Sequence, residues 1–587
     1  MKNFLSSLLA TIVGILILSI VGILIFAGII AASTSREVPD VEENTVLVAE
    51  LNTPIPDRSD ENPFTQFFSM TPGFGEVMGL NQILNSIEKA GEDENIEGIF
   101  LNLSIIPADI ATVEEIRNAL LKFRNESGKF IYAYADTYTQ NAYYLATAAD
   151  SIFMTPEGMF FFPGLAAEAT FFKNALDKLG IEMQVIRHGS YKSAAEQFTR
   201  EDLSEANREQ IEAYVGSIWE RMVEGISEAR GISPELLNRY ADEMISLENE
   251  KAVETGMIDG LIYYDEMLTL MKEKLHVEQE DDLESISLKR YRDVPPPEKK
   301  AISRDRIAVI YAMGMVVEGE AGEGYIGSER IARAIRKARR DESVKAIVLR
   351  VNSGGGSAIA SDVIYREAKL AAEEKPFVAS MGDVAASGGY YIACPADTIL
   401  ASPNTITGSI GVVFTMPNLK ELLNEKLGIT TDVVKTNRHA DLLSVSGPLD
   451  EEERAIIRKS VEKTYDRFVS VVAEGRSMTY EEVDAIGGGR VWSGADAMEI
   501  GLIDMLGGLE ESIGVAAEMA GLETYRVQSL PRLEDPLTMI MRELGGGVKM
   551  KMIRSELGNE FRYYRQLQDL RRVEGIQTIM PFTLEVR

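Results

Sequence analysis

Ser387 has surroundings that suit covalent chemistry. It follows a predicted buried strand, residues 377–380, and a short turn, and it precedes Gly388, Gly389 and a predicted helix. A hydroxyl at such a place lies near the positive end of a helix, and the Gly388 amide can point at a developing oxyanion. The same residues can also form an ordinary helix cap. A nucleophilic role for Ser387 therefore depends on a partner.

That partner must be a general base, and the chain offers few. None of its three histidines, His188, His276 and His439, lies in a recognisable triad motif. Lysine can also act as a base with serine, provided that burial or nearby positive charge holds its amine neutral. Taken alone, Lys192 is best interpreted as a solvated surface residue. The organisation of the chain changes this interpretation.

The chain contains two similar halves. Residues 143–150 match residues 390–397 at a spacing of 247, and residues 178–181 match residues 426–429 at a spacing of 248. The register therefore holds through the middle of both halves, which indicates an internal duplication.

The halves differ where chemistry would occur. The repeat aligns Ser387 with Gln140, and it aligns Lys192 with Ala440. Lys192 lies 52 residues after Gln140, whereas the second half offers only His439 or Ala440 at 52 or 53 residues after Ser387. Each half has thus kept one member of a serine–lysine pair. The two halves must face each other to form one active site.

A glycine-rich run, residues 351–357, follows a predicted strand of the second half. Glycines after a parallel strand let the backbone turn tightly and expose its amides where α/β proteins bind ligands. The run lacks the lysine of a phosphate loop and the spacing of a dinucleotide fingerprint. It indicates an anion site, with a flexible turn as the alternative.

Alternating strands and helices would position these residues. Short apolar runs such as 98–101 and 346–349 are typical of buried parallel strands, and helical patterns follow both. We expect an α/β fold with a parallel core in each half.

The boundaries follow from the repeat and from composition. The two repeats are predicted over residues 44–285 and 305–523, and a charged, proline-containing linker over 286–304. Residues 524–587 are expected to form a helical C-terminal extension, which packs on the fold or lines an oligomer contact.

The N-terminal region predicts a membrane anchor. Residues 4–32 carry no charge, and about 20 apolar residues are enough to span a bilayer. A cleaved signal peptide is the alternative, but its apolar region normally has only about 7–15 residues. We expect residues 1–33 to be a retained anchor. Lys2 before the span and a single Arg36 among acidic residues after it predict a cytoplasmic N-terminus.

Composition excludes several classes of protein. With 92 acidic and 60 basic residues the formal charge is −32, which argues against nucleic-acid binding. A single cysteine, Cys394, excludes internal disulfides and a cysteine-based zinc site, and three histidines argue against a multi-histidine metal site. We expect no metal, no cofactor and no nucleic acid.

Three motifs resemble a known family. Residues 382–391, 352–357 and 190–194 look like the long, duplicated form of the signal peptide peptidase A family, also called protease IV, of the Clp-protease and crotonase superfamily. The resemblance covers essentially residues 1–520. It implies an α/β fold of two tandem Clp-protease/crotonase-like repeats after an N-terminal transmembrane helix.

The resemblance also implies roles for individual residues. Ser387 would be the nucleophile and Lys192 the general base, with the amides of Gly356 and Gly388 as the oxyanion hole. The family usually has proline where this chain has Gly354, which should loosen the turn without removing an amide. Implied substrates are cleaved signal peptides and other extended apolar peptides, and the implied assembly is a homotetramer.

We therefore predict a serine endopeptidase with a Ser387/Lys192 dyad that acts through an acyl-enzyme. It would be a single-pass protein of the bacterial inner membrane, with its catalytic part on the extracytoplasmic side. A crotonase-type acyl-CoA enzyme is one alternative, but it would not need Ser387. The other is a catalytically silent membrane scaffold, which would have little reason to retain Ser387 and Lys192 together.

Overall fold

The structure is a computed structural model. The described residues are 39–59, 77–297, 303–322, 324–533, 575–580 and 585–586, with five positions between 13 and 20. The predicted anchor, residues 1–33, lies almost wholly outside them. Within the part of the chain that is described, no helix is long and apolar enough to cross a membrane.

The first half is built on a six-stranded sheet whose pairs are all parallel. Its strands, in spatial order, are β7 (Gly260–Leu261), β4 (Ser151–Phe160), β3 (Phe130–Tyr138), β2 (Ile96–Leu103), β1 (Thr45–Ala49) and β8 (Ser285–Ser287). The helices of this half are α3 (Leu80–Glu92), α4 (Ile110–Ser127), α5 (Gln140–Ala146), α6 (Lys173–Leu179), α7 (Glu196–Thr199), α8 (Glu205–Arg230), α9 (Pro234–Asp242), α10 (Asn249–Glu254), α11 (Tyr264–Leu275) and α12 (Leu288–Tyr291). Apolar residues fill the central strands because helices cover them.

The second half has an eight-stranded sheet that is parallel except for one antiparallel pair at its edge. Its main path is β18 (Val491–Ser493), β16 (Ile406–Gly408), β14 (Phe377–Ala386), β12 (Val344–Ser353), β9 (Arg306–Met313) and β20 (Arg526–Leu530). Off this path, β15 (Thr398–Ala401) pairs with β14, and β19 (Met505–Leu506) pairs with β15. The helices are α13 (Ser328–Arg340), α14 (Ala358–Ala372), α15 (Gly388–Ala393), α16 (Glu451–Arg476), α17 (Tyr480–Ile486), α18 (Gly494–Glu499) and α19 (Leu509–Met519). The predicted α/β fold with a parallel core in each half is confirmed.

The duplication extends to individual hydrogen bonds. The Tyr143 hydroxyl donates to the Met257 carbonyl at 2.8 Å, and the Tyr390 hydroxyl donates to the Leu502 carbonyl at 2.7 Å. These tyrosines are the residues that the sequence repeat aligns at a spacing of 247. Equivalent side chains therefore tie equivalent elements together in the two halves.

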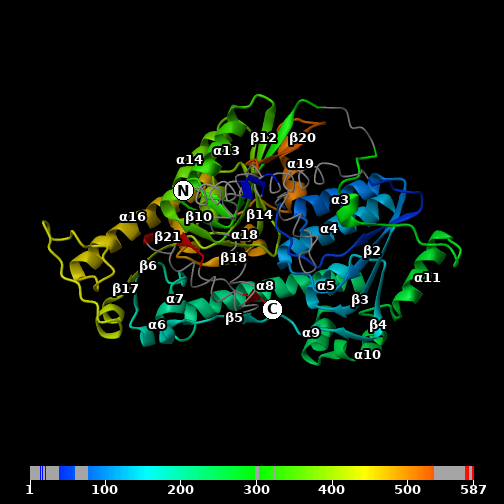
Figure 1. Ribbon diagram of the computed structural model, residues 1–587, viewed down its shortest axis with the longest axis horizontal. Coiled ribbons are helices and arrows are strands. Elements are labelled where there is room, and N and C mark those ends of the chain that lie inside the picture. The colour runs from blue at the N-terminus through cyan, green and yellow to red at the C-terminus, as the bar shows by residue number, and fades with distance from the viewer. Residues whose placement is uncertain are drawn as a thin grey trace, which may run out of the picture.

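One hydrophobic cluster contains residues of both halves. A single cluster of buried side chains includes Ile99 and Leu120 of the first half and Val348 and Leu509 of the second. In Figure 1 the blue helices α3 and α4 lie beside the orange helix α19. The relative position of the halves is thus fixed by packing.

A third sheet joins the halves directly. It runs β11 (Tyr325–Gly327), β10 (Met315–Val317), β13 (Gly355–Ser357), β21 (Gly575–Ile579), β17 (Val412–Asn418) and β6 (Glu182–His188). β6 comes from the first half and pairs antiparallel with β17 of the second, from His188 opposite Val412 to Glu182 opposite Asn418. Figure 1 shows β6 and α7 beside β17, away from the other strands of the first half.

The predicted linker, 286–304, begins with ordered elements rather than with a solvated chain. β8 pairs with β1, and α12 follows it directly. Leu288 and Tyr291 of this helix are buried. Their spacing of three residues places both on one face of the helix, although charged neighbours dominate the sequence.

The predicted helical extension, 524–587, differs from the described parts, which are strands. β20 extends the second-half sheet beside β9, and β21 lies inside the third sheet. β22 (Glu585–Val586) pairs with β5 (Ala167–Glu168). The hydrogen-bonding edges of neighbouring strands decide the conformation here, against the local propensity.

Candidate active site

Ser387 lies between β14 and α15 with an unusual backbone conformation. Its φ is 56° and its ψ is −113°, a region that costs a side-chain-bearing residue about 1–3 kcal/mol. Its N–H donates to the Gly408 carbonyl at 2.8 Å, and its carbonyl accepts from the Tyr391 N–H at 2.8 Å. These bonds hold the turn in place against the strain and fix the direction of the Ser387 side chain.

Lys192 lies in the loop after β6, and the second half helps to hold it. The Tyr191 N–H donates to the Gly488 carbonyl at 3.1 Å, while the Arg187 guanidinium donates to the Lys192 carbonyl at 3.0 Å. A Cβ on Gly489 would lie 2.6 Å from the Lys192 Cα, so glycine is required at that position. The pairing of β6 with β17 brings this loop to the second half.

The structure brings Lys192 and Ser387 together within one chain. The Lys192 Nζ lies 2.8 Å from the Ser387 Oγ, and neither side chain is exposed to solvent. The same nitrogen lies 3.0 Å from the Ser409 carbonyl and 3.0 Å from the Ser409 Oγ. Burial lowers the pKa of Lys192 well below its usual range.

The three oxygens around Lys192 match the valence of a neutral amine. Such an amine has two N–H donors and one lone pair. The Ser409 carbonyl can only accept, so it takes one N–H, and the Ser409 hydroxyl can take the other. The lone pair then faces the hydroxyl of Ser387, which is the geometry of a proton acceptor.

Ser409 is a site residue that sequence reasoning missed. It follows β16, is fully buried, and has a positive φ of 50°. At the repeat spacing of 247 it aligns with Phe162. A serine in one half opposite a phenylalanine in the other is the kind of half-specific difference that singled out Ser387 and Lys192, so the same comparison could have found it.

The glycine-rich run lies against Ser387. The point at which a Gly355 Cβ would stand is 2.7 Å from the Gly388 nitrogen and 3.1 Å from the Ser387 Cβ. Gly355 has a φ of 98°, which favours glycine, and its N–H donates to the Ser353 Oγ at 3.1 Å. Gly356, in β13, lies next in the chain. Of the two residues predicted for an oxyanion hole, Gly388 follows Ser387 directly, and Gly356 follows Gly355.

Gly354 occupies less crowded space. A Cβ at this position would meet its nearest neighbour, the Met580 Cβ, at 3.5 Å, which is ordinary contact. Its carbonyl accepts from the Met580 N–H. The loop is therefore tied to a neighbouring strand at the position where the family usually has proline.

The counterpart positions in the repeat do not carry this chemistry. The Gln140 side chain is buried, and its Oε1 accepts from the Gly164 N–H at 2.9 Å. Ala440 is exposed and lies between β17 and α16 in the chain. The structure thus assembles one serine–lysine pair from two halves.

The histidines lie in other surroundings. The ring of His188 stacks on Tyr465 with centroids 3.9 Å apart, and His276 ends α11. His439 lies beside Glu452, 3.6 Å away. Among the described residues, no group of three or more His, Cys, Asp or Glu side chains is placed to hold a metal ion.

Buried ion pairs anchor the strand that leads to the glycine run. Arg350 of β12 is fully buried, and its guanidinium binds Asp57 at 2.6 Å and Glu115 at 2.6 Å. Both carboxylates belong to the first half. The neighbouring Asn352 donates to Asp57 at 2.9 Å and to Asp383 at 3.2 Å. Burial, and then the charge of a nearby carboxylate, raises the pKa of Asp383 to about 7. These contacts couple the position of the glycine run to the first half.

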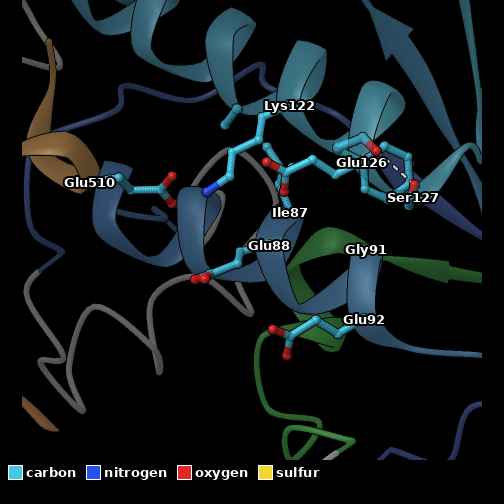
Figure 2. A pocket seen from close by; sticks show the side chains of 10 residues that line it. Ile87, Glu88, Gly91, Glu92, Lys122, Glu126, Ser127 and Glu510 are labelled. Atoms are coloured by element: carbon cyan, nitrogen blue, oxygen red, sulfur yellow. Dashed lines mark hydrogen bonds between the residues drawn. The ribbon is translucent and has the colours of Figure 1, made fainter. Parts of the chain in front are cut away.

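A cavity of about 230 Å³ lies elsewhere, between α3, α4 and α19. Figure 2 shows acidic side chains around it, with the Lys122 amine directed toward Glu510. Burial, and then the charge of Glu88, raises the pKa of Glu510 to about 7. Neither Ser387 nor Lys192 lines this cavity. It belongs to the junction of the two halves.

Comparison with known proteins identifies the class. Residues 123–278 and 369–523 each match the family described as Peptidase family S49. The "Serine protease SPPA, chloroplastic" of Arabidopsis thaliana is 36% identical over 516 residues, which cover 86% of this chain and 75% of that protein. "Protease 4" of Salmonella typhi is 37% identical over 494 residues, 82% of this chain and 79% of that protein.

A solved structure of a ClpP1 mutant from Listeria monocytogenes is 16% identical and covers 35% of this chain and 94% of its own. Its TM-score of 0.24 is too low to support an argument.

The class of protein is therefore a serine peptidase built from two tandem α/β domains. The two matched segments fall one in each half and together span more than half of the chain. The chain belongs to peptidase family S49.

Proposed function

We propose that this protein is a membrane-anchored serine endopeptidase in which Ser387 is the nucleophile and Lys192 the general base. The observation that carries the proposal is the 2.8 Å distance between the Lys192 Nζ and the Ser387 Oγ, with both side chains buried. Burial lowers the pKa of Lys192, which favours the neutral amine that a general base requires.

The first step forms an acyl-enzyme. The Lys192 lone pair takes the hydroxyl proton of Ser387 while the Oγ attacks the substrate carbonyl carbon. The amides of Gly356 and Gly388 stabilise the oxyanion. The tetrahedral intermediate then breaks the peptide C–N bond, and the Lys192 ammonium gives its proton to the leaving amine.

The second step regenerates the enzyme. The neutral Lys192 takes a proton from water, and the resulting hydroxide attacks the ester carbon. The ester bond to Ser387 breaks, and its Oγ recovers a proton from Lys192. The carboxylic acid product loses its own proton to solvent and leaves as a carboxylate. Ser409 holds the amine in the same orientation through both steps, because its two oxygens occupy the two N–H groups of neutral Lys192.

The proposed substrates are cleaved signal peptides and other extended apolar peptides. Support comes from the motif resemblance to the signal peptide peptidase A family and from the strands β13 and β17 at the site. Strands of this kind bind an extended peptide through main-chain hydrogen bonds.

We also propose a single-pass anchor over residues 1–33, the bacterial inner membrane as location, the catalytic part on the extracytoplasmic side, and a homotetramer. The charge-free residues 4–32 and their flanking charges support the anchor. Carbonate extraction with and without residues 1–33 tests the anchor. Protease accessibility in spheroplasts tests the side of the membrane, and light scattering in detergent tests the homotetramer. Release of the intact chain by carbonate would overturn the anchor.

Substitution tests the dyad. Ser387→Ala and Lys192→Ala should each abolish hydrolysis of a fluorogenic peptide and leave the circular dichroism spectrum unchanged. Lys89→Ala is a matched control, because Lys89 is a buried lysine whose amine binds the Tyr291 and Val294 carbonyls far from the dyad in sequence. This variant should keep its activity per folded molecule. Full activity in Lys192→Ala would refute the assignment of the base.

A serine-reactive phosphonate distinguishes the alternatives. Under the proposal, mass spectrometry finds the adduct on Ser387 in the wild type and no adduct in Lys192→Ala. A crotonase-type enzyme or a silent scaffold would leave Ser387 unmodified.

A further inference from the structure

A turn of three glycines, residues 487–489, packs against the loop that carries Lys192. The turn joins α17 to β18, and its Gly488 carbonyl accepts from the Tyr191 N–H at 3.1 Å. The point at which a Gly489 Cβ would stand is 2.6 Å from the Lys192 Cα, so the two backbones are in direct contact. The position of the glycine turn therefore bears on the general base of the proposed reaction.

The glycine turn also decides which way the Ser409 hydroxyl points. The Ser409 Oγ donates to the Gly489 carbonyl at 3.3 Å, and it lies 3.0 Å from the Lys192 Nζ. A hydroxyl has only one proton, so a hydroxyl that donates to Gly489 can only accept from Lys192. The lone pair of the Lys192 amine then stays free for the proton of Ser387.

The opposite orientation of the Ser409 hydroxyl would hinder the reaction. A hydroxyl that donated to the Lys192 nitrogen would occupy its lone pair and compete with Ser387 for it. Ser409 is fully buried, so its hydroxyl cannot turn to bulk water instead. The Gly489 carbonyl thus selects the productive orientation, provided that the glycine turn keeps its position.

Tyr465 of α16 holds the glycine turn from the side away from Ser409. Its buried hydroxyl accepts from the Gly488 N–H at 3.2 Å and donates to the Asp484 Oδ1 at 2.5 Å. The point at which a Gly487 Cβ would stand is 3.1 Å from the same oxygen. Burial raises the pKa of Tyr465, so the hydroxyl keeps its proton and can serve both bonds at once.

The ring of Tyr465 contacts the other segment that leads to Lys192. The ring of His188 stacks on it with centroids 3.9 Å apart. His188 is the last residue of β6, four residues before Lys192. Figure 1 shows α16 beside β6. Tyr465 thus touches both the end of β6 and the glycine turn, the two segments that meet at Lys192.

We propose that Tyr465 is a positioning residue for the general base. It holds the glycine turn so that the Gly489 carbonyl keeps the proton of Ser409 away from the lone pair of Lys192. Tyr465 acts through Gly488, Gly489 and Ser409 and does not contact the reacting atoms. The proposal rests on the proposed function.

The experiment measures kcat and KM of the full chain in detergent with a fluorogenic peptide, corrected for the folded fraction by circular dichroism. Tyr465→Phe keeps the ring that stacks on His188 but removes the hydroxyl that binds Gly488. Its kcat should fall about fivefold with KM unchanged, because the interaction affects proton transfer and not substrate binding.

Tyr480→Phe is the matched control. The Tyr480 hydroxyl of α17 donates to Asp466 of α16 at 2.8 Å, so this variant also loses a tyrosine–aspartate bond between the same two helices. Tyr480 is exposed, and among the described residues no hydrogen bond joins it to the glycine turn. Its variant should keep the wild-type kcat.

A double-mutant cycle tests the route through Ser409. If Tyr465 acts by orienting the Ser409 hydroxyl, its own hydroxyl has no effect on kcat once that of Ser409 is gone. The double variant Tyr465→Phe/Ser409→Ala should therefore have a kcat within about twofold of Ser409→Ala alone. A general loosening of the fold would lower kcat by the same factor in both backgrounds.

The remaining outcomes separate this inference from the proposed function. A wild-type kcat in Tyr465→Phe, an equal fall in Tyr480→Phe, or factors that multiply in the double variant would each overturn the role of Tyr465. The proposed function would stand in all three cases, provided that Lys192→Ala is inactive. Full activity in Lys192→Ala would instead reject the proposed function, and the role of Tyr465 with it.

Discussion

Replacement of Lys192 by methionine should make the protein more stable and inactive. Methionine keeps a long unbranched side chain but removes the amine. Lys192 is fully buried, and burial lowers its pKa in the folded chain well below the usual lysine value of 10.5. The unfolded chain keeps the usual value. Between these two pKa values, unfolding therefore takes up one proton, which stabilises the unfolded wild type.

The size of the stability difference between Lys192→Met and the wild type follows from this one proton. Because the unfolded wild type binds the extra proton, its free energy of unfolding rises with pH through the window, by about 1.4 kcal/mol per pH unit. The Lys192→Met variant has no such proton. Its advantage over the wild type is therefore largest near the acid end of the window. It should shrink as the pH rises through the window toward the usual lysine pKa of 10.5.

Urea unfolding of the full chain in detergent, followed by tryptophan fluorescence, measures both free energies at each pH. Ser387→Ala is the control, because it removes activity but retains Lys192, and it should follow the pH dependence of the wild type. If Lys192→Met and the wild type instead changed in parallel with pH, the lysine would be protonated in the folded protein. The general-base assignment would then fail.

Four further substitutions test the surroundings of the dyad. Ser409→Ala should lower kcat about tenfold with little change in KM, because the amine loses an orienting contact. The acid limb of its pH–rate profile should also move to lower pH, since the protonated amine loses an acceptor. Gly355→Ala should lower kcat about 100-fold or more, because the new Cβ would stand 2.7 Å from the Gly388 nitrogen. Gly354→Ala, with its nearest contact at 3.5 Å, should be nearly neutral in the same peptide assay. Arg350→Met should cost about 3–5 kcal/mol in urea unfolding, because it leaves two buried carboxylates without their cation. A loss below about 1 kcal/mol would show that this ion pair is not needed to join the halves.

The sequence predicted the parts of the site that the duplication marks. Comparison of aligned positions singled out Ser387 and Lys192, which the structure brings to 2.8 Å. The alternation of apolar runs and helical patterns also predicted the parallel sheets, because buried strands need apolar side chains on both faces. The apolar runs are a local pattern, and the aligned positions repeat at a fixed spacing. Both can therefore be recognised in a single sequence.

The sequence did not predict contacts that depend on the third sheet. β21 is a short segment whose conformation is set by β13 and β17, both distant in sequence. No sequence pattern indicates the partners of Arg350, because Asp57 and Glu115 lie in the other half and have no fixed spacing from it. Such pairings arise from tertiary packing and not from local pattern.

The third sheet also explains how a divided site can be precise enough for proton transfer. A lysine on a separate domain would need that domain to stay within a few tenths of an ångström, because proton transfer requires hydrogen-bond distance. Here β6 is a strand of the same sheet as β13 and β17, and Lys192 follows it by only four residues. The glycine run before Ser387 is tied to the first half from the opposite side by Arg350. The pairing of β6 with β17 and the ion pairs of Arg350 thus each connect one half to the other. A change that loosens β6 from β17 should therefore lower kcat even where it touches neither Lys192 nor Ser387.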